Sequence, residues 1–186
     1  MALKERKRRC AKGFTLIETV MSIVILGIVA VTAGLLIYQG TRSYGEMDRM
    51  RGLTAQATLA SERMARELMT MRCSNSNATR CLPTASDITV MTGQEVRFVN
   101  SNNEGRGLRL DGAANAVKLR QGINNGDPED ALAGKVSGLT FTYLDRSNAS
   151  AASAVDVWTV LMDITLTDGN QSVSIRGRAH PKAFER

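Results

Sequence analysis

Glu18 is the residue whose type and position carry the clearest chemical implication, because it is the only charged residue between positions 14 and 38. An ionised carboxylate that faces lipid is disfavoured by up to a few kcal/mol, so a glutamate inside an apolar run needs a partner. The alternative is an interfacial glutamate whose side chain reaches toward the lipid headgroups. Gly13 and Phe14 lie just before Glu18, and a basic segment precedes all three. We treat these residues as the primary candidate site.

The sequence offers little for catalysis or metal binding. His180 is the only histidine, and the chain contains no Ser/His/Asp or Cys/His set, no glycine-rich phosphate loop and no cluster with metal-ligand spacing. Asp127, Glu129 and Asp130 could serve as calcium ligands, but Asn-Gly-Asp-Pro is itself a turn sequence. We predict a solvated turn there, and we expect no enzyme activity, no metal site and no cofactor.

The basic composition does not point to nucleic acid. The formal net charge is +6, but six of the 24 Lys and Arg residues and one of the 18 Asp and Glu residues lie in the first 13 positions. Two further groups of basic residues could contact phosphates: Arg106, Arg109, Lys118 and Arg120, and Arg176, Arg178, Lys182 and Arg186. Acidic residues are interspersed and stacking aromatics are missing, so we predict an ordinary solvated sheet face and no nucleic-acid partner.

The candidate site is positioned by a membrane segment. The run from Phe14 to Tyr38 is longer than the ~20 residues that a helix needs to cross a hydrocarbon core. Because the basic residues precede it, the positive-inside rule places the N-terminus in the cytoplasm and the rest of the chain on the far side. We divide the chain into a basic leader (1–13), a transmembrane half of a helix (14–39) and an exported head (40–186).

The helix continues into the head, where its pattern becomes one-sided and then gives way to strands. An apolar stripe at spacings of three and four predicts helix to about residue 71, with these positions on one face: Leu53, Ala57, Ala60, Met64, Leu68 and Met71. Alternating apolar residues then predict about seven short, mostly antiparallel strands, around 88–90, 96–98, 108–110, 117–119, 139–143, 160–166 and 173–175. The expected fold is α+β, with a long N-terminal helix packed on an antiparallel sheet.

Two cysteines lie in the predicted exported part. Cys73 and Cys81 follow the helix within a turn-rich stretch, and an oxidising compartment permits a disulfide between them. We favour the bridge over two free thiols. Cys10 lies among the leader charges and is interpreted as incidental.

The segment Lys12-Gly13-Phe14-Thr15-Leu16-Ile17-Glu18-Thr19 resembles the processing motif of type IV pilins and type II secretion pseudopilins. That resemblance implies a pilin-like fold and a membrane prepilin peptidase that cuts after Gly13 and methylates the amino group of Phe14. It also implies that Glu18 pairs with the N-terminal amine of an adjacent subunit during assembly. The expected partners are the peptidase, other pilin or pseudopilin subunits, the inner membrane and the inner-membrane assembly platform.

Looser similarities favour a minor subunit. The helical run 60–68 and the strands from residue 134 onward resemble minor pilins and the minor pseudopilin J group, and no cysteine follows Cys81 to close a C-terminal loop of the kind found in major pilins. The implied location is the bacterial inner membrane, followed by a cell-surface pilus or a periplasmic pseudopilus, in a priming or tip complex. Two alternatives stay open: a tip module that binds a surface or DNA, and an anchored exported protein that never polymerises.

Overall fold

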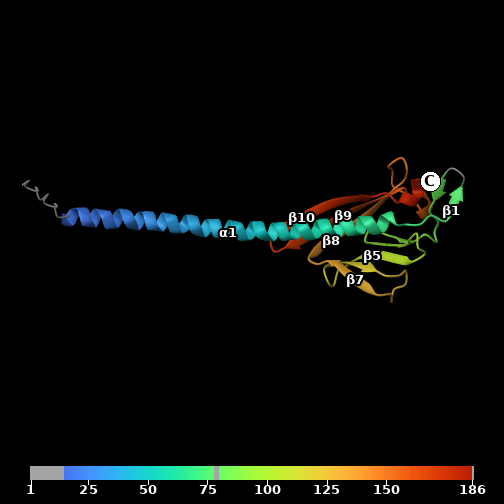
Figure 1. The fold of residues 1–186 in the computed structure, drawn as a ribbon, viewed down its shortest axis with the longest axis horizontal. Helices are drawn as coiled ribbons and strands as arrows, with labels where there is room; N and C mark the ends of the chain where they lie inside the picture. Colours follow the sequence, from blue (N-terminus) through green and yellow to red (C-terminus); the bar gives the residue numbers. More distant parts are fainter. Residues whose placement is uncertain (1–14, 78–79, 186) are drawn as a thin grey trace, which may run out of the picture. The chain divides into compact units, whose positions relative to one another are not determined.

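The computed structural model describes residues 15–77 and 80–185, so Gly13, Phe14 and Cys10 lie outside the described residues. The chain divides into two compact units, Met1–Glu46 and Met47–Arg186, and the second is called the head below. The fold is α+β: one long apolar helix at the N-terminus is followed by antiparallel strands (Figure 1).

Helix α1 runs from Leu16 to Met69 and belongs to both units. Its C-terminal end comes two residues before the predicted one because the chain tightens there: the N–H of Met71 donates to the carbonyl of Leu68 at 3.2 Å. Met71 then forms an antiparallel bridge with Asn100, and the N–H of Arg72 donates to the carbonyl of Val99 at 2.9 Å. The residues that the stripe assigned to the last helical turn therefore join the helix to a strand instead.

A three-stranded antiparallel sheet has the order β10-β9-β8, with bounds Gln171–Ala179, Thr159–Asp168 and Val136–Leu144. Its inward positions line up across the strands, so that Ile175 lies opposite Ile164, which lies opposite Leu139. The next row pairs Gly177 with Met162. The central strand β9 is buried at every inward position, as expected for a strand covered on one face.

A five-stranded antiparallel meander forms the second sheet, in the order β3-β4-β5-β6-β7. The bounds of its strands are Ile88–Met91, Glu95–Val99, Gly105–Asp111, Ala116–Arg120 and Glu129–Ala133. The two sheets meet where the N–H of Phe141 donates to the carbonyl of Gly93 at 2.7 Å and the Tyr143 hydroxyl donates to the carbonyl of Thr92 at 2.9 Å. Burial raises the pKa of Tyr143, which keeps its hydroxyl protonated as a donor.

The remaining elements are short. Strands β1 (Asn75–Asn77) and β2 (Arg80–Leu82) form a small hairpin, and two 3-10 turns cover Ala154–Asp156 and Lys182–Glu185. All seven predicted strands are confirmed, as β3 to β6 and β8 to β10. The hairpin β1–β2 and strand β7 were not predicted.

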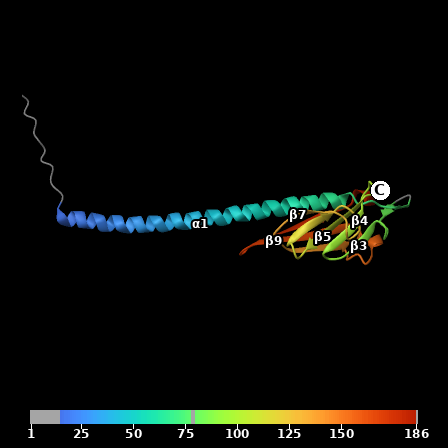
Figure 2. The same cartoon turned by 90° about the horizontal axis from the view of Figure 1, so that it is seen from below.

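The core of the head confirms the predicted stripe. All six of its residues are buried, and Ala57, Met64 and Leu68 are fully inaccessible. Figures 1 and 2 show the C-terminal part of α1 lying over the strands as a separate layer. The helix approaches β10 closely at Gly177, where an added Cβ would lie 2.7 Å from Oγ of Ser61. Helix and sheet therefore pack at a distance that a glycine permits.

Candidate functional site

The start of α1 is capped by Thr15. Its carbonyl accepts the N–H groups of Glu18 and Thr19, each at 3.1 Å, and its Oγ1 accepts the N–H of Glu18 at 3.4 Å. A threonine three residues before a glutamate, at the head of an apolar run, is the spacing of a capping box. This Thr15–Glu18 spacing marks where the helix begins and was not among the predicted features.

Glu18 lies in the first turn of α1 and is exposed. The free N–H groups of a helix N-terminus carry partial positive charge, so a carboxylate is favoured at this position. Among the residues that the structure describes, the Glu18 carboxylate makes no ion pair within the chain. The main-chain N–H of Glu18 is therefore held by Thr15.

The hydroxyl groups of the membrane segment are satisfied within the helix. Ser22 donates to the carbonyl of Glu18 at 2.7 Å, and Thr32 donates to that of Val29 at 2.9 Å. Thr19 similarly reaches the carbonyl of Thr15 at 3.3 Å. A hydroxyl that donates to a carbonyl of the preceding turn does not expose an unpaired hydrogen-bond donor to lipid. These residues are therefore compatible with a lipid environment.

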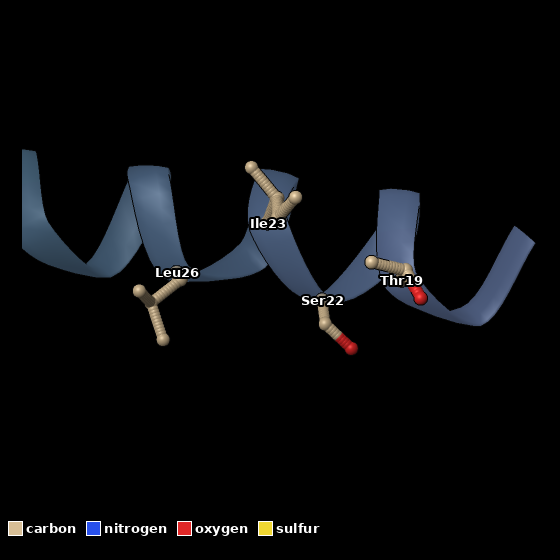
Figure 3. Close-up of a pocket in the computed structure, with 4 residues that line it drawn as sticks. All are labelled: Thr19, Ser22, Ile23 and Leu26. Atoms are coloured by element: carbon tan, nitrogen blue, oxygen red, sulfur yellow. The ribbon is translucent and has the colours of Figure 1, made fainter. Parts of the chain in front are cut away.

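A shallow groove follows Glu18 along the helix. It is lined by Thr19, Ser22, Ile23 and Leu26, which lie on successive turns and are drawn in Figure 3. Hydroxyl-bearing side chains occupy the end nearer Glu18 and apolar ones the end farther away. The groove is open to the outside of the helix.

The N-terminal part of α1 exposes apolar side chains on every side. Between Leu16 and Tyr38 no described residue is buried. Among the described residues, α1 is the one helix long and apolar enough to cross a membrane. A surface of this kind is covered by lipid or by other proteins.

In the head, the structure joins Cys73 and Cys81 by a disulfide, with their Cα atoms 5.8 Å apart. The bridge closes the β1–β2 hairpin directly after α1. It lies among the residues that link the helix end to the five-stranded sheet, not at a binding cleft.

Asp87 forms hydrogen bonds to the segments on both sides of the β1–β2 hairpin. Its buried carboxylate accepts hydrogen bonds from Nε of Arg72 at 2.6 Å, from the N–H of Ser74 at 3.0 Å and from the N–H of Thr84 at 2.9 Å. Burial by itself raises the pKa of Asp87, but the hydrogen bonds from Ser74, Arg72 and Thr84 outweigh it and lower that pKa from 3.8 to about 2. Asp87 was not predicted as a site residue, since nothing in the residues beside it in the sequence marks it as buried.

An ion network covers one face of the five-stranded sheet. Glu129 accepts two bonds from Arg109, both at 2.7 Å, and one from Nη2 of Arg120 at 2.5 Å, while Lys118 pairs with Asp111 at 2.6 Å. The bonds from Arg109 chiefly lower the pKa of Glu129, to about 2, against a smaller opposing effect of burial. The predicted solvated turn is therefore wrong for Glu129, which lies in β7 and holds three strands together.

Several of the residues considered for calcium and for phosphate have partners within the head. Asp127 accepts the N–H of Asn124 at 2.7 Å, Asp130 accepts from Gln121 at 2.5 Å, and Glu129 binds arginines, so these carboxylates are not gathered into one group. Within 15–77 and 80–185, no group of three His, Cys, Asp or Glu residues could hold a metal ion. The first basic group is neutralised by carboxylates, and Arg176 of the second pairs with Asp163 at 2.7 Å.

His180 is half-buried beside Trp158. Their ring centroids lie 4.5 Å apart, and Nδ1 of His180 is 2.6 Å from the Trp158 carbonyl. On Trp158, Arg146 adds a cation–π contact at 5.1 Å. These contacts are those of a packed aromatic cluster near the C-terminus.

Residues 8–34 match a family profile described as "Prokaryotic N-terminal methylation motif". The match includes Gly13, Phe14 and Glu18 and extends into the apolar part of α1. No curated protein matches the chain.

Proposed function

We propose that the chain is a subunit of a type IV pilus or a type II secretion pseudopilus, made as a precursor and matured by a prepilin peptidase. The methylation motif indicates such a processed subunit. The observation that carries the proposal is the order of residues along the chain. Gly13 and Phe14, within the matched segment, come directly before Thr15, and Thr15 caps a helix of membrane length. Cleavage after Gly13 would leave Phe14 as the N-methylated first residue of the mature chain.

Glu18 is the assembly residue in this proposal. Its carboxylate receives the N-terminal amine of the neighbouring subunit, which is the cation that a carboxylate in an apolar segment needs. The support is its exposure in the first turn and a main-chain N–H that Thr15 already satisfies. The groove from Thr19 to Leu26 then accepts side chains of the neighbouring helix.

The finer assignment is to a minor subunit, of the kind that primes assembly or occupies the filament tip. Two features support it. The disulfide closes a hairpin directly after α1, whereas major pilins close a loop near the C-terminus. The only three prolines are Pro83, Pro128 and Pro181, so α1 contains none of the prolines common in the helices of major pilins.

Mass spectrometry of the exported protein tests the processing step. We expect a mature chain that starts at Phe14 and carries one added methyl group at its amino terminus. Detection of only the full-length chain, or of a cut beyond residue 30, would contradict the proposal.

Filament incorporation tests the role of Glu18. We expect Glu18→Val to insert into the membrane normally but to enter sheared filaments at least fivefold less than the parent, because the pairing group is gone. Glu62→Val, a matched change at an exposed position of α1 in the head, should be incorporated like the parent. Equal incorporation of both variants would remove Glu18 from the assembly step.

A further inference from the structure

The edges of the two sheets are protected to very different degrees. Strand β3 is four residues long and its pairing with β4 is shifted, and β7 is five residues long with a shift in its pairing to β6. The outer edge of β8 is occupied, since the N–H of Phe141 reaches the carbonyl of Gly93 and the carbonyl of Tyr143 accepts from the N–H of Ala151. Short, irregular or covered edges resist pairing with other chains.

Strand β10 lacks each of these protections. It is nine residues long, pairs with β9 in unbroken register from Gln171 to Ala179, and contains no proline. In the described residues, no main-chain hydrogen bond reaches 172–178 from any element other than β9. Figure 1 shows β10 beside β9, and the strand order makes it the border of its sheet. Alternate residues along β10 therefore present free N–H and C=O groups in a row.

The side chains of β10 specify what would pair with it. On the face toward α1, Val173 and Ile175 are only partly buried, so they still offer apolar area at the border. On the opposite face, Arg176 and Arg178 are exposed. Asp163 pairs with Arg176, and Arg178 donates to the amide oxygen of Asn148. The two arginines are therefore accompanied by one carboxylate in these contacts, that of Asp163.

We propose that β10 is a docking edge that accepts an extended segment of another protein as a fourth strand, and that the side chains of this segment alternate between apolar and acidic. Its apolar side chains would cover Val173 and Ile175, and its acidic side chains would lie beside Arg176 and Arg178. Opposite charges at neighbouring cross-strand positions stabilise such a pairing, and the main-chain bonds supply affinity.

A second copy of this chain is a poorer occupant. Pairing β10 with β10 would bring four arginines onto one face of the joined sheet, and like charges on adjacent strands are destabilising. Strand β7 of a second copy does not fit β10 either. Its acidic residues Glu129 and Asp130 are adjacent in the sequence, so their side chains point to opposite faces of the strand and do not alternate with apolar side chains.

Peptide binding to the full chain in detergent micelles tests the proposal independently of filament assembly. The probe is a seven-residue peptide of alternating valine and glutamate, blocked at both ends. Three comparisons accompany it: the same peptide with lysine in place of glutamate, the same peptide with alternate backbone amides N-methylated, and the chain variant Arg176→Glu/Arg178→Glu. The variant Arg51→Glu/Arg66→Glu, at exposed positions of α1, is the matched charge control.

We expect the glutamate peptide to slow amide exchange, measured by NMR, at alternate residues of 172–178. Affinity should fall at least fivefold with the N-methylated peptide and with the Arg176→Glu/Arg178→Glu variant, which should instead prefer the lysine peptide. The Arg51→Glu/Arg66→Glu control should bind like the parent. Equal binding of the glutamate and lysine peptides, or no protection in β10, would overturn the proposal. Concentration-dependent protection of β10 without peptide would overturn the choice of occupant in favour of a second copy.

Discussion

The close approach of α1 to β10 can be tested with one methyl group. Gly177→Ala would place its Cβ 2.7 Å from Oγ of Ser61 and 3.0 Å from Cγ of Met162, and the first distance is shorter than real Cβ contacts. Either the helix moves from the sheet or both side chains shift. Overpacking of this kind costs about 1–3 kcal/mol. Alanine is otherwise the better residue in a strand by roughly 0.5–1 kcal/mol, so a measured loss reports the clash itself.

Two further variants separate the clash from other effects. Ser61→Ala removes the oxygen at 2.7 Å, so the double variant should recover at least half of the loss, a coupling of about 1 kcal/mol. Gly138→Ala in β8 is the control, because its Cβ would meet only Thr165 at an ordinary 3.8 Å and should not destabilise the head.

Trp158 is the only tryptophan in the chain, so its fluorescence follows denaturant unfolding of the head while the apolar part of α1 remains in a detergent micelle. The expected order of midpoints is parent and Gly138→Ala highest, the double variant intermediate and Gly177→Ala lowest. If Gly177→Ala is as stable as the parent, or if Ser61→Ala does not relieve it, the helix does not lie against β10 at this point.

Three further predictions use the same assay. Met64→Asp should lose several kcal/mol and unfold the head, because Met64 is fully buried and an unpaired carboxylate would replace it, whereas the exposed Thr58→Asp should be tolerated. Replacing Cys73 and Cys81 together by serine should lower stability by about 2–3 kcal/mol, and reduction of the parent should match this loss. Asp87→Asn should cost about 2 kcal/mol at neutral pH. Because the folded pKa of Asp87 is depressed, the parent should lose this contribution as pH falls from 3.8 to about 2, where the two proteins converge.

The sequence predicts those elements whose apolar pattern is set by one buried face. The stripe through Met64 and Leu68 keeps its spacing of three and four because one side of the helix faces the sheet. Strand β9 keeps its alternation through Met162 and Ile164 for the same reason, with a period of two. In both elements the buried positions are apolar, and the spacing of these apolar residues distinguishes a helix from a strand.

The unpredicted elements are those held by something other than an apolar face. The β1–β2 hairpin is polar and is closed by the Cys73–Cys81 bridge. Strand β7 begins with Glu129, whose carboxylate binds Arg109 twenty residues away and Arg120 nine residues away. These partners meet only because of the register of β5, β6 and β7, and local sequence carries no information on register between strands of mixed polarity.

The candidate site shows the same division between local and long-range information. Gly13, Phe14 and Glu18 could be singled out because the roles proposed for them depend on neighbours in the sequence and on the apolar run that follows. Asp87 could not, because its burial depends on Arg72, Ser74 and Thr84 arriving from both sides of the disulfide hairpin.

A single helix serves two environments, and its composition changes where they change. From Leu16 to Tyr38 apolar side chains surround it and none is buried by the chain itself, so this part depends on lipid or on other subunits. From Leu53 to Leu68 the head buries one apolar face of the helix completely, although Leu59 stays exposed on another side. Substitutions in the second part should therefore act through the stability of the head, as Met64→Asp tests, and substitutions in the first part through insertion or assembly, as Glu18→Val tests. A stable head that fails to assemble when Glu18 is replaced, beside an unstable head when Met64 is replaced, would establish that the two halves of α1 carry separate functions.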